Sequence, residues 1–167
     1  MEIKKYPRLT EVGAWRVNRM DVPFYFRRNA EPGEPTPIGG LYTQEDIKEM
    51  VSYAADRQIE IIPEIDMPGH AEAALSAYPE LGCFGLPVEI PQSGFTLRTY
   101  FVAGKDGTLR FLKNVLDEVC ALFPSPYIHL GGDEAPKRQL GSMPGLPEKD
   151  YHRRTERQSR PPAMVLC

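Results

Sequence analysis

Two stretches of the chain share one arrangement, in which an amphipathic helix is followed by a short turn, an apolar strand and a polar end. In the first stretch, Thr43 and Asp46 have the spacing of a capping box at a helix N-terminus. Four apolar residues follow at helical spacing: Ile47, Met50, Val51 and Ala54. This pattern predicts a helix that closes near Arg57. The β-branched run "IEIIPEIDMPGH" then predicts a buried parallel strand that ends at Pro68-Gly69.

The second stretch repeats the arrangement later in the chain. One helical stripe is formed by Leu109, Leu112, Leu116, Val119, Cys120 and Phe123. Pro124-Ser125-Pro126 ends this helix, and "YIHLGGDE" supplies the following strand. Alternating helices and strands predict right-handed βαβ units and a parallel sheet, which binds ligands at the carboxyl ends of its strands. Residues 27–40 and 84–94 are rich in proline and glycine, and they predict long loops beside an active site.

The first predicted strand has one polar and one apolar face. Its residues alternate as two sets, with Ile62, Glu64 and Asp66 on one face and Ile61, Pro63 and Ile65 on the other. A face with two acids suits the interior of a barrel near its mouth, where acids meet polar partners and water. Alternatively, Glu64 and Asp66 pair with basic residues of neighbouring strands as structural supports. That alternative applies less to Asp66, which lies at the strand tip.

The second strand ends in two neighbouring acids, Asp133 and Glu134, directly after Gly131-Gly132. Neighbouring residues of a regular strand point to opposite faces, so both acids can serve one ligand only where the backbone leaves the pleat, as two glycines permit. A solvated acidic turn is the alternative. Acids without a clustered lysine or a phosphate-binding glycine loop favour sugar or metal chemistry over phosphoryl transfer. Glycoside hydrolysis needs one acid to protonate the leaving oxygen and a negative group to support the developing cation.

Composition excludes several other classes of protein. The 167 residues are 41% hydrophobic and 26% charged, which is typical of one globular domain or part of one. Because 20 basic and 23 acidic residues leave a formal charge of −3, we expect neither nucleic acid nor a membrane surface as a partner. The start, "MEIKKYPRLT", lacks the apolar core of a signal peptide, so the sequence itself specifies no compartment.

Three blocks of the sequence resemble the family 20 glycoside hydrolases, the β-N-acetylhexosaminidases. They are "EIKKYPRLTEVGAWR", "GGLYTQEDIKEMVSYAADRQIEIIPEIDMPGHAEAALSAYPEL" and "YIHLGGDEAPK", which contains the family signature H-x-G-G-D-E. The resemblance implies an α/β fold, a partial (β/α)₈ TIM barrel comprising roughly its third and fourth βα units. It also implies a parent enzyme that is periplasmic, secreted or lysosomal. We expect residues 1–137 to be a fragment of the catalytic domain and residues 138–167 to be a non-homologous tail, either disordered or frameshifted.

The family implies roles for individual residues. Glu134 matches the general acid/base, and Asp133 matches the residue that orients the 2-acetamido group of the substrate and stabilises the oxazolinium ion. His70 resembles a histidine near the acid/base; its structural alternative is a helix-start histidine satisfied by backbone. Asp66, Glu64 and His129 are expected to bind substrate or to support the site, with a structural role favoured for His129 because it lies within the strand. The nucleophile is the substrate's own acetamide, so the resemblance implies no metal and no organic cofactor.

The implied activity is removal of terminal, non-reducing N-acetylglucosamine or N-acetylgalactosamine from glycans, with retention of configuration. Sugar-binding residues that the family carries on its other barrel strands are missing, so we expect this fragment alone to be inactive. Two alternatives come from other classes. One is a carbohydrate-binding remnant or the product of a broken gene. The other is a metal-dependent hydrolase with Asp66, His70, Asp133 and Glu134 as ligands.

Overall fold

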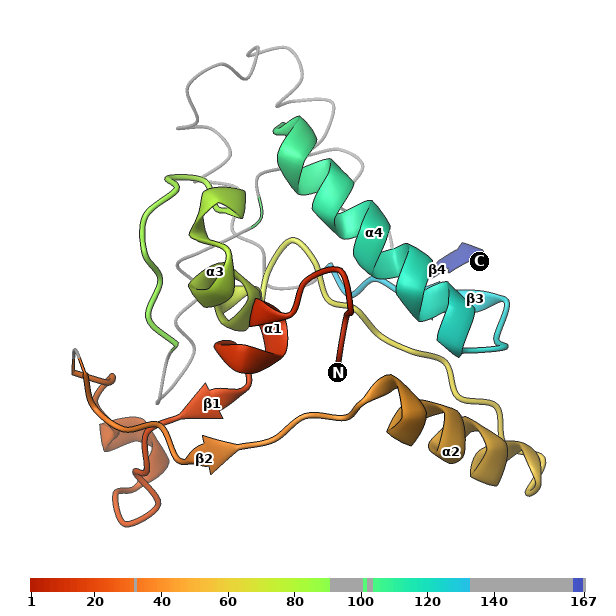
Figure 1. Cartoon of the computed structure of the whole chain (residues 1–167), viewed down its shortest axis with the longest axis horizontal. Helices are drawn as coiled ribbons and strands as arrows, with labels where there is room; N and C mark the ends of the chain where they lie inside the picture. The colour runs from red at the N-terminus through yellow and green to blue at the C-terminus, as the bar shows by residue number, and fades with distance from the viewer. Residues whose placement is uncertain (32, 91–100, 102–103, 133–163, 167) are drawn as a thin grey trace.

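The structure, a computed structural model, describes residues 1–31, 33–90, 101, 104–132 and 164–166. Its elements along the chain are α1 (Arg8–Glu11), β1 (Trp15–Arg16), the 3₁₀ turn η1 (Phe24–Phe26), β2 (Ile38–Gly39), α2 (Gln44–Ala55), α3 (Glu72–Ala77), the 3₁₀ turn η2 (Pro79–Leu81), α4 (Asp106–Leu122), β3 (Tyr127–His129) and β4 (Met164–Leu166). Figure 1 shows α2 and α4 on one side of the molecule, with α1 and α3 on the other. None of the helices in the described ranges is long and apolar enough to span a membrane.

Both predicted helices are present with the predicted ends. The Thr43 side chain accepts a hydrogen bond from the backbone N–H of Asp46, and the Asp46 carboxylate accepts from the N–H of Thr43, so the predicted capping box is confirmed at the start of α2. The helix ends at Ala55, two residues before Arg57. The second predicted helix, α4, ends at Leu122, and only its C-cap residue Phe123 separates it from the Pro124-Ser125-Pro126 run.

The predicted apolar stripe of α4 is only partly right. Val119 is completely buried, but Leu109 is 52% exposed. The buried side chains of the helix are Thr108, Phe111, Val115, Val119 and Leu122. The stripe was predicted from leucine spacing, whereas the buried face is centred on the ring of Phe111, which contacts the rings of Tyr6, Tyr78 and Phe101. These rings are contributed by the N-terminal segment, the end of α3 and the loop before α4.

The predicted parallel pairing of the two strands is confirmed over a short length. We call residues 59–67 the central segment; in Figure 1 it is the yellow stretch that runs back from α2 toward α3. Glu64 pairs with His129 of β3 in the parallel sense. The His129 N–H donates to the Pro63 carbonyl and the Ile65 N–H donates to the His129 carbonyl, both at 2.9 Å. On the other side of β3, β4 pairs antiparallel in the register Tyr127↔Leu166.

The prediction that this strand is buried is wrong for part of its length. Ile59, Ile62 and Glu64 are exposed, while Pro63 is buried and Ile61 and Ile65 pack against the core. The alternation of faces is nevertheless as predicted. The apolar face meets the core, and the other face carries Glu64, which is exposed, and Asp66, which is partly exposed.

One hydrophobic core joins both helix–strand units to the segments around them. Its buried residues include Ile3, Ile47, Leu75, Phe111, Val119 and Ile128. A carboxylate at the edge of this core ties the N-terminus and both long helices together. The Glu118 carboxylate on α4 accepts hydrogen bonds from the backbone N–H groups of Lys4 and Lys5 at 2.8 and 3.0 Å, and from the buried Gln44 side chain of α2 at 2.7 Å.

Candidate functional site

The candidate site lies where the central segment and β3 end side by side. Because the two strands are parallel, their carboxyl ends reach the same edge. Asp66 is at the end of one strand and Gly131-Gly132 at the end of the other. Asp133 and Glu134 directly follow these glycines, and they lie outside the described residues.

The Asp66 carboxylate holds the turn that precedes the two acids. The N–H of Gly132 donates to Asp66 Oδ1 at 3.1 Å. Gly131 has a φ of +60°, and a Cβ atom built on it would lie 1.9 Å from the same oxygen. Both facts require glycine at position 131, because a side chain there would be strained and would collide with the carboxylate. The backbone therefore leaves the pleat at this point, as the paired glycines predicted.

The second oxygen of Asp66 faces a predicted catalytic residue. His70 Nε2 lies 4.0 Å from Asp66 Oδ2, and both side chains are partly exposed, at 39% and 24%. His70 itself has a φ of +50° and precedes α3, whose N-cap is Ala71. His70 therefore lies just outside the helix start. The His70 imidazole thus lies near Oδ2 of the Asp66 carboxylate, and the glycine turn is hydrogen-bonded to Oδ1 of the same carboxylate.

His129 lies between Glu64 and the first glycine. Its Nδ1 is 3.1 Å from Glu64 Oε1, and the Gly131 N–H donates to the same Nδ1 at 3.1 Å. One ring nitrogen cannot accept from an N–H and donate to a carboxylate at the same time. An Nδ1 without a proton accepts from Gly131 and leaves the proton on Nε2, whereas a protonated Nδ1 donates to Glu64. Only the second arrangement is the pairing with a basic residue of a neighbouring strand that was the structural alternative for Glu64.

Four of the six predicted site residues are among the described residues, and they lie at or near this edge. Asp66, His70, Glu64 and His129 are described and lie in the contacts given above. The acids Asp133 and Glu134 remain predictions. Among the described residues no group of three or more histidine, cysteine, aspartate or glutamate side chains could hold a metal ion. The ligand set proposed for a metal-dependent hydrolase includes both acids outside these residues, so it stays untested.

The sequence did not single out Gly131 and Phe101 as functional residues. Gly131 lies too close to the Asp66 carboxylate to carry a side chain, and the only sequence signal for it was the paired glycine before two acids. The Phe101 N–H donates to the Pro68 carbonyl at 3.1 Å, which attaches the segment before α4 to the turn between Asp66 and His70. No sequence pattern pointed to that attachment.

The chain is similar to enzymes that hydrolyse glycosides. The sequence profile of "Glycosyl hydrolase family 20, catalytic domain" matches residues 1–158. A beta-hexosaminidase of Porphyromonas gingivalis is 47% identical over 137 residues, which are 82% of this chain and 16% of that protein. A beta-hexosaminidase of Vibrio furnissii is 45% identical over 142 residues, covering 81% of this chain and 22% of that protein. The chain thus spans less than a quarter of either relative.

Solved structures agree with these relatives. The beta-N-acetylhexosaminidase of Bacteroides fragilis superimposes with a TM-score of 0.64 at 49% identity, over 95% of this chain and 26% of that chain. A mutant Streptomyces plicatus beta-hexosaminidase in complex with product (GlcNAc) gives a TM-score of 0.66 at 37% identity, over 83% of this chain and 25% of that chain. The catalytic domain of these neighbours is a TIM barrel, so the expected fold class is confirmed and this chain covers a fragment of it.

Proposed function

Because the chain belongs to glycosyl hydrolase family 20, we propose that Asp133 and Glu134 are the acids of a retaining β-N-acetylhexosaminidase that uses the acetamido group of its substrate. The substrates are glycans that end in a non-reducing N-acetylglucosamine or N-acetylgalactosamine. The observation that supports this most directly is the Asp66 carboxylate on the Gly131-Gly132 turn, because it fixes the backbone from which both acids emerge. The site thereby has a rigid support at the carboxyl ends of paired parallel strands.

The proposed reaction has two steps. Glu134 donates its proton to the glycosidic oxygen as the bond to the anomeric carbon breaks, and the acetamide carbonyl oxygen forms the new bond to that carbon. Asp133 accepts a hydrogen bond from the acetamide N–H and balances the positive charge of the oxazolinium ion. Water then attacks the anomeric carbon, the Glu134 carboxylate takes the proton of that water, and the ring opens to restore the acetamide. Two inversions at one carbon give retention.

The neighbouring groups have supporting roles in this proposal. Asp66 positions the turn. His70 lies 4.0 Å from the second oxygen of Asp66, and the two form an ion pair when the imidazole is protonated. Glu64 and His129 lie two residues before Asp66 and Gly131 on their strands, and their contact links the central segment to β3. The substrate supplies the nucleophile, so this mechanism uses neither a metal nor an organic cofactor.

The 167-residue chain alone is expected to give no hydrolysis of an aryl N-acetyl-β-glucosaminide above background. The described residues include only two parallel strands of the barrel, and an open site leaves water where the transition-state charge must be stabilised. Turnover that is abolished by Glu134→Gln would contradict this expectation. Calorimetry of the same chain with N-acetylglucosamine tests the alternative of a carbohydrate-binding remnant, which requires measurable binding without turnover.

The roles of the two acids are tested in a hybrid enzyme. Residues 1–137 replace the matched region of the P. gingivalis relative, whose remaining sequence supplies the rest of the barrel. Glu134→Gln should lose most activity on substrates with poor leaving groups and recover part of it with an aryl group that leaves unprotonated. Asp133→Asn should slow both kinds of substrate. Asp117→Asn, an exposed carboxylate on α4, is the control and should leave the rates unchanged. Equal losses for both acid variants on both substrates would refute the assigned roles.

A further inference from the structure

The Gly131 N–H at the candidate site depends on one side chain. Gly131 is buried, so its N–H needs a hydrogen-bond partner within the protein. The backbone bonds between the central segment and β3 end one residue earlier, where the Met67 N–H donates to the Leu130 carbonyl at 3.1 Å. Among the described residues, the acceptor for the Gly131 N–H is therefore His129 Nδ1 alone, at 3.1 Å.

A carboxylate lies at the same distance from this nitrogen. Glu64 Oε1 is 3.1 Å from His129 Nδ1. When Nδ1 carries no proton, its lone pair accepts from the Gly131 N–H, and no hydrogen lies between Nδ1 and the Glu64 oxygen. When a proton from solvent binds Nδ1, the new N–H donates to Glu64 and faces the N–H of Gly131. The two hydrogen bonds exclude each other, and the charge of the imidazole selects between them.

The two partners of His129 do not lose equally when their hydrogen bond is broken. The Glu64 side chain is 55% exposed, so water solvates its carboxylate whenever Nδ1 does not donate. The N–H of Gly131 is buried, and a buried donor that loses its acceptor bears the full cost of desolvation. Protonation of His129 therefore acts on the glycine turn, whereas deprotonation leaves Glu64 hydrated.

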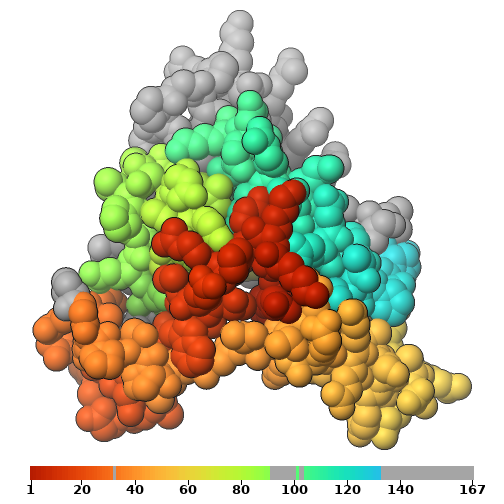
Figure 2. Space-filling model, viewed as in Figure 1, coloured from red at the N-terminus to blue at the C-terminus, as the bar shows by residue number. Residues whose placement is uncertain are grey.

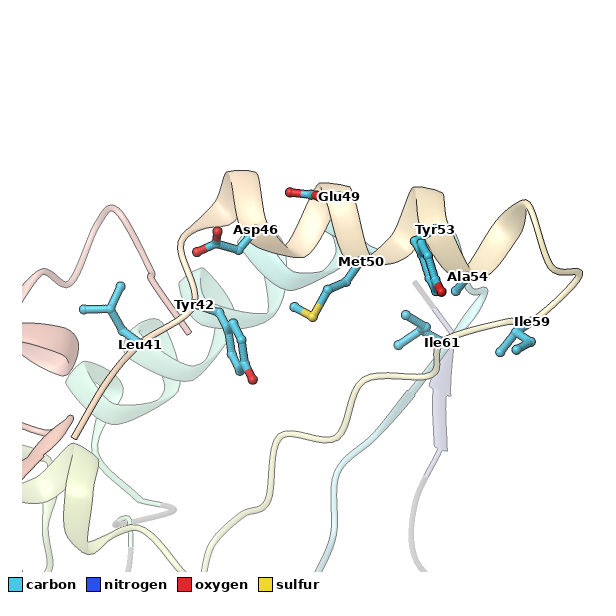
Figure 3. Close-up of a pocket in the computed structure, with 9 residues that line it drawn as sticks. All are labelled: Leu41, Tyr42, Asp46, Glu49, Met50, Tyr53, Ala54, Ile59 and Ile61. Atoms are coloured by element: carbon cyan, nitrogen blue, oxygen red, sulfur yellow. The ribbon is translucent and has the colours of Figure 1, made fainter. Parts of the chain in front are cut away.

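The central segment is held at both ends. At its start the Ile59 N–H donates to the Ala54 carbonyl of α2 at 3.0 Å. Figure 3 shows Ile61 lying beside Ala54, on the side of the segment that faces α2. Farther along, the Ile65 N–H donates to the His129 carbonyl at 2.9 Å. The backbone of this segment is therefore fixed when the imidazole changes its charge.

The strand β3 is held as firmly. Ile128, the neighbour of His129, is 1% exposed and belongs to the hydrophobic core. β3 follows α4, and Figure 2 shows the N-terminal segment, in red, packed between α3 and α4. By contrast, Gly131 and Gly132 have positive φ angles of +60° and +105°, in a region that glycine enters readily. The turn is thus the part of the site that can respond.

The other charged groups near His129 belong to the strand tip and to the start of α3. Asp66 accepts from the Gly132 N–H through Oδ1. His70 Nε2 lies 4.0 Å from Asp66 Oδ2, so a second histidine titrates on the far side of that carboxylate. β4 pairs Met164 with His129, and neither this residue nor the buried side chains of α4 titrate. A test must therefore separate the effect of His129 from that of His70.

We propose that His129 is a positioning residue that holds the Gly131 N–H while its imidazole is neutral and, when protonated, releases it by donating to Glu64 instead. Acidification then removes one of the two hydrogen bonds of the glycine turn, and the bond to the Asp66 carboxylate remains. Because the two proposed catalytic acids directly follow this turn, their position depends on the charge of the imidazole. That consequence rests on the proposed function, whereas the change at Gly131 does not.

The test is a nuclear magnetic resonance titration of the full ¹⁵N-labelled chain between about pH 8 and pH 5. Ring ¹⁵N shifts report whether Nδ1 of His129 carries a proton, and amide hydrogen exchange reports the protection of the Gly131 N–H. We expect the neutral ring to carry its proton on Nε2. On acidification the Gly131 amide signal should change with the same midpoint as the His129 ring. Its protection, relative to an unfolded peptide at the same pH, should fall about tenfold or more.

Two variants of His129 separate the hydrogen bond from packing. His129→Asn keeps an acceptor oxygen near the place of Nδ1 and cannot titrate, so Gly131 should stay protected at every pH. His129→Phe keeps a ring and removes the acceptor, so this protection should be lost at every pH. Thermal melts show whether each variant is folded, and His129→Asn keeps the test decisive where the phenylalanine variant does not fold.

Three more variants identify the groups that compete or titrate. Glu64→Ala removes the competing acceptor, so the release of Gly131 should require a lower pH. Its matched control is Glu60→Ala, which removes an exposed carboxylate of the same segment and should behave like the parent chain. His70→Gln should leave the titration of the Gly131 amide in place.

Three results would overturn the proposal. They are a neutral His129 ring with its proton on Nδ1, a Gly131 protection that does not change as His129 titrates, and a Gly131 titration that disappears in His70→Gln. An inactive hybrid enzyme would instead refute the proposed function, because none of these readouts uses the two acids or requires turnover.

Discussion

Replacing Gly131 by alanine should cost more than the same change at any glycine that lies in open space. The positive φ of +60° at Gly131 places alanine in the left-handed region, at a cost of about 1–2 kcal/mol. Its Cβ would lie 1.9 Å from Asp66 Oδ1, so the carboxylate has to rotate away and lose the hydrogen bond from the Gly132 N–H. A hydrogen bond to a charged group contributes about 1.5–3 kcal/mol, and the partial exposure of Asp66 favours the lower end. The expected loss in the free energy of unfolding is therefore about 3 kcal/mol.

A double-mutant cycle separates the two contributions. Asp66→Ala alone loses the hydrogen bond, about 1.5 kcal/mol, and removes the atom with which the new Cβ collides. In that background Gly131→Ala should cost only the backbone penalty, so the two changes together should be about 1.5 kcal/mol less damaging than their sum. Gly85→Ala is the control, because Gly85 has a φ of +62° and nothing within 4 Å of its Cβ position. It should cost about 1–2 kcal/mol in either background.

The assay is urea unfolding followed by the fluorescence of Trp15, the single tryptophan of the chain. Its indole N–H donates to the Thr10 carbonyl at 2.9 Å, which gives the folded state a defined environment around the probe. Constant m-values across the variants are needed before midpoints are compared. Additive costs within about 0.5 kcal/mol, or a Gly131→Ala variant no worse than Gly85→Ala, would refute the contact between Asp66 and the glycine turn.

Three further outcomes are expected. Glu118→Gln should lower the free energy of unfolding by about 2 kcal/mol, because an amide has one acceptor oxygen where the carboxylate accepts from three N–H donors. Urea unfolding midpoints measure this loss, with Asp117→Asn as the control. The hydrogen bond from Arg19 lowers the pKa of the Glu34 carboxyl from 4.5 to about 2. The ion pair therefore stabilises the folded state fully above the unfolded-state pKa of Glu34, and this stabilisation disappears as the pH falls through about 2. A carboxyl ¹³C titration would follow this, and a midpoint near 4.5 would contradict the ion pair. Sequencing of the gene should reveal a one-base frameshift near codons 137–139, with the shifted frame continuing into barrel sequence; a shifted frame that meets an immediate stop or encodes nothing like the family would dismiss it.

Local chemistry predicted α2 well. The capping box of Thr43 and Asp46 is formed by groups three residues apart, so their partners are visible in the sequence itself. The buried face of α4 was harder to predict, because apolar spacing shows that faces exist and does not show which neighbour lies against each. Leu109 fits the periodic stripe and is exposed, whereas Phe111 is buried through rings contributed by three distant segments.

The sequence predicted where the site lies, but it did not predict which atoms contact one another there. The carboxyl ends of parallel strands meet at one edge, so Asp66 and the Gly131-Gly132 turn were expected to be neighbours. The hydrogen bond from the Gly132 N–H to Asp66 joins residues 66 positions apart, and no local pattern fixes which oxygen faces which amide. The elements α1, β1, β2 and α3 were not predicted at all. Each is six residues or shorter, which is too short for helical or strand periodicity to be recognised.

Strand register explains why the glycine and the aspartate must occur together. Glu64 lies opposite His129 in the parallel pairing, so two residues farther along each strand Asp66 lies opposite Gly131 on the same face. A slip of one residue would turn Asp66 toward the core and place Ile65 at the turn. The register is held by the backbone bonds of Pro63 and Ile65 to His129, below the strand tips. The position from which the acids emerge is therefore set by an ordinary sheet pairing, and the carboxylate of Asp66 transmits that register to the turn.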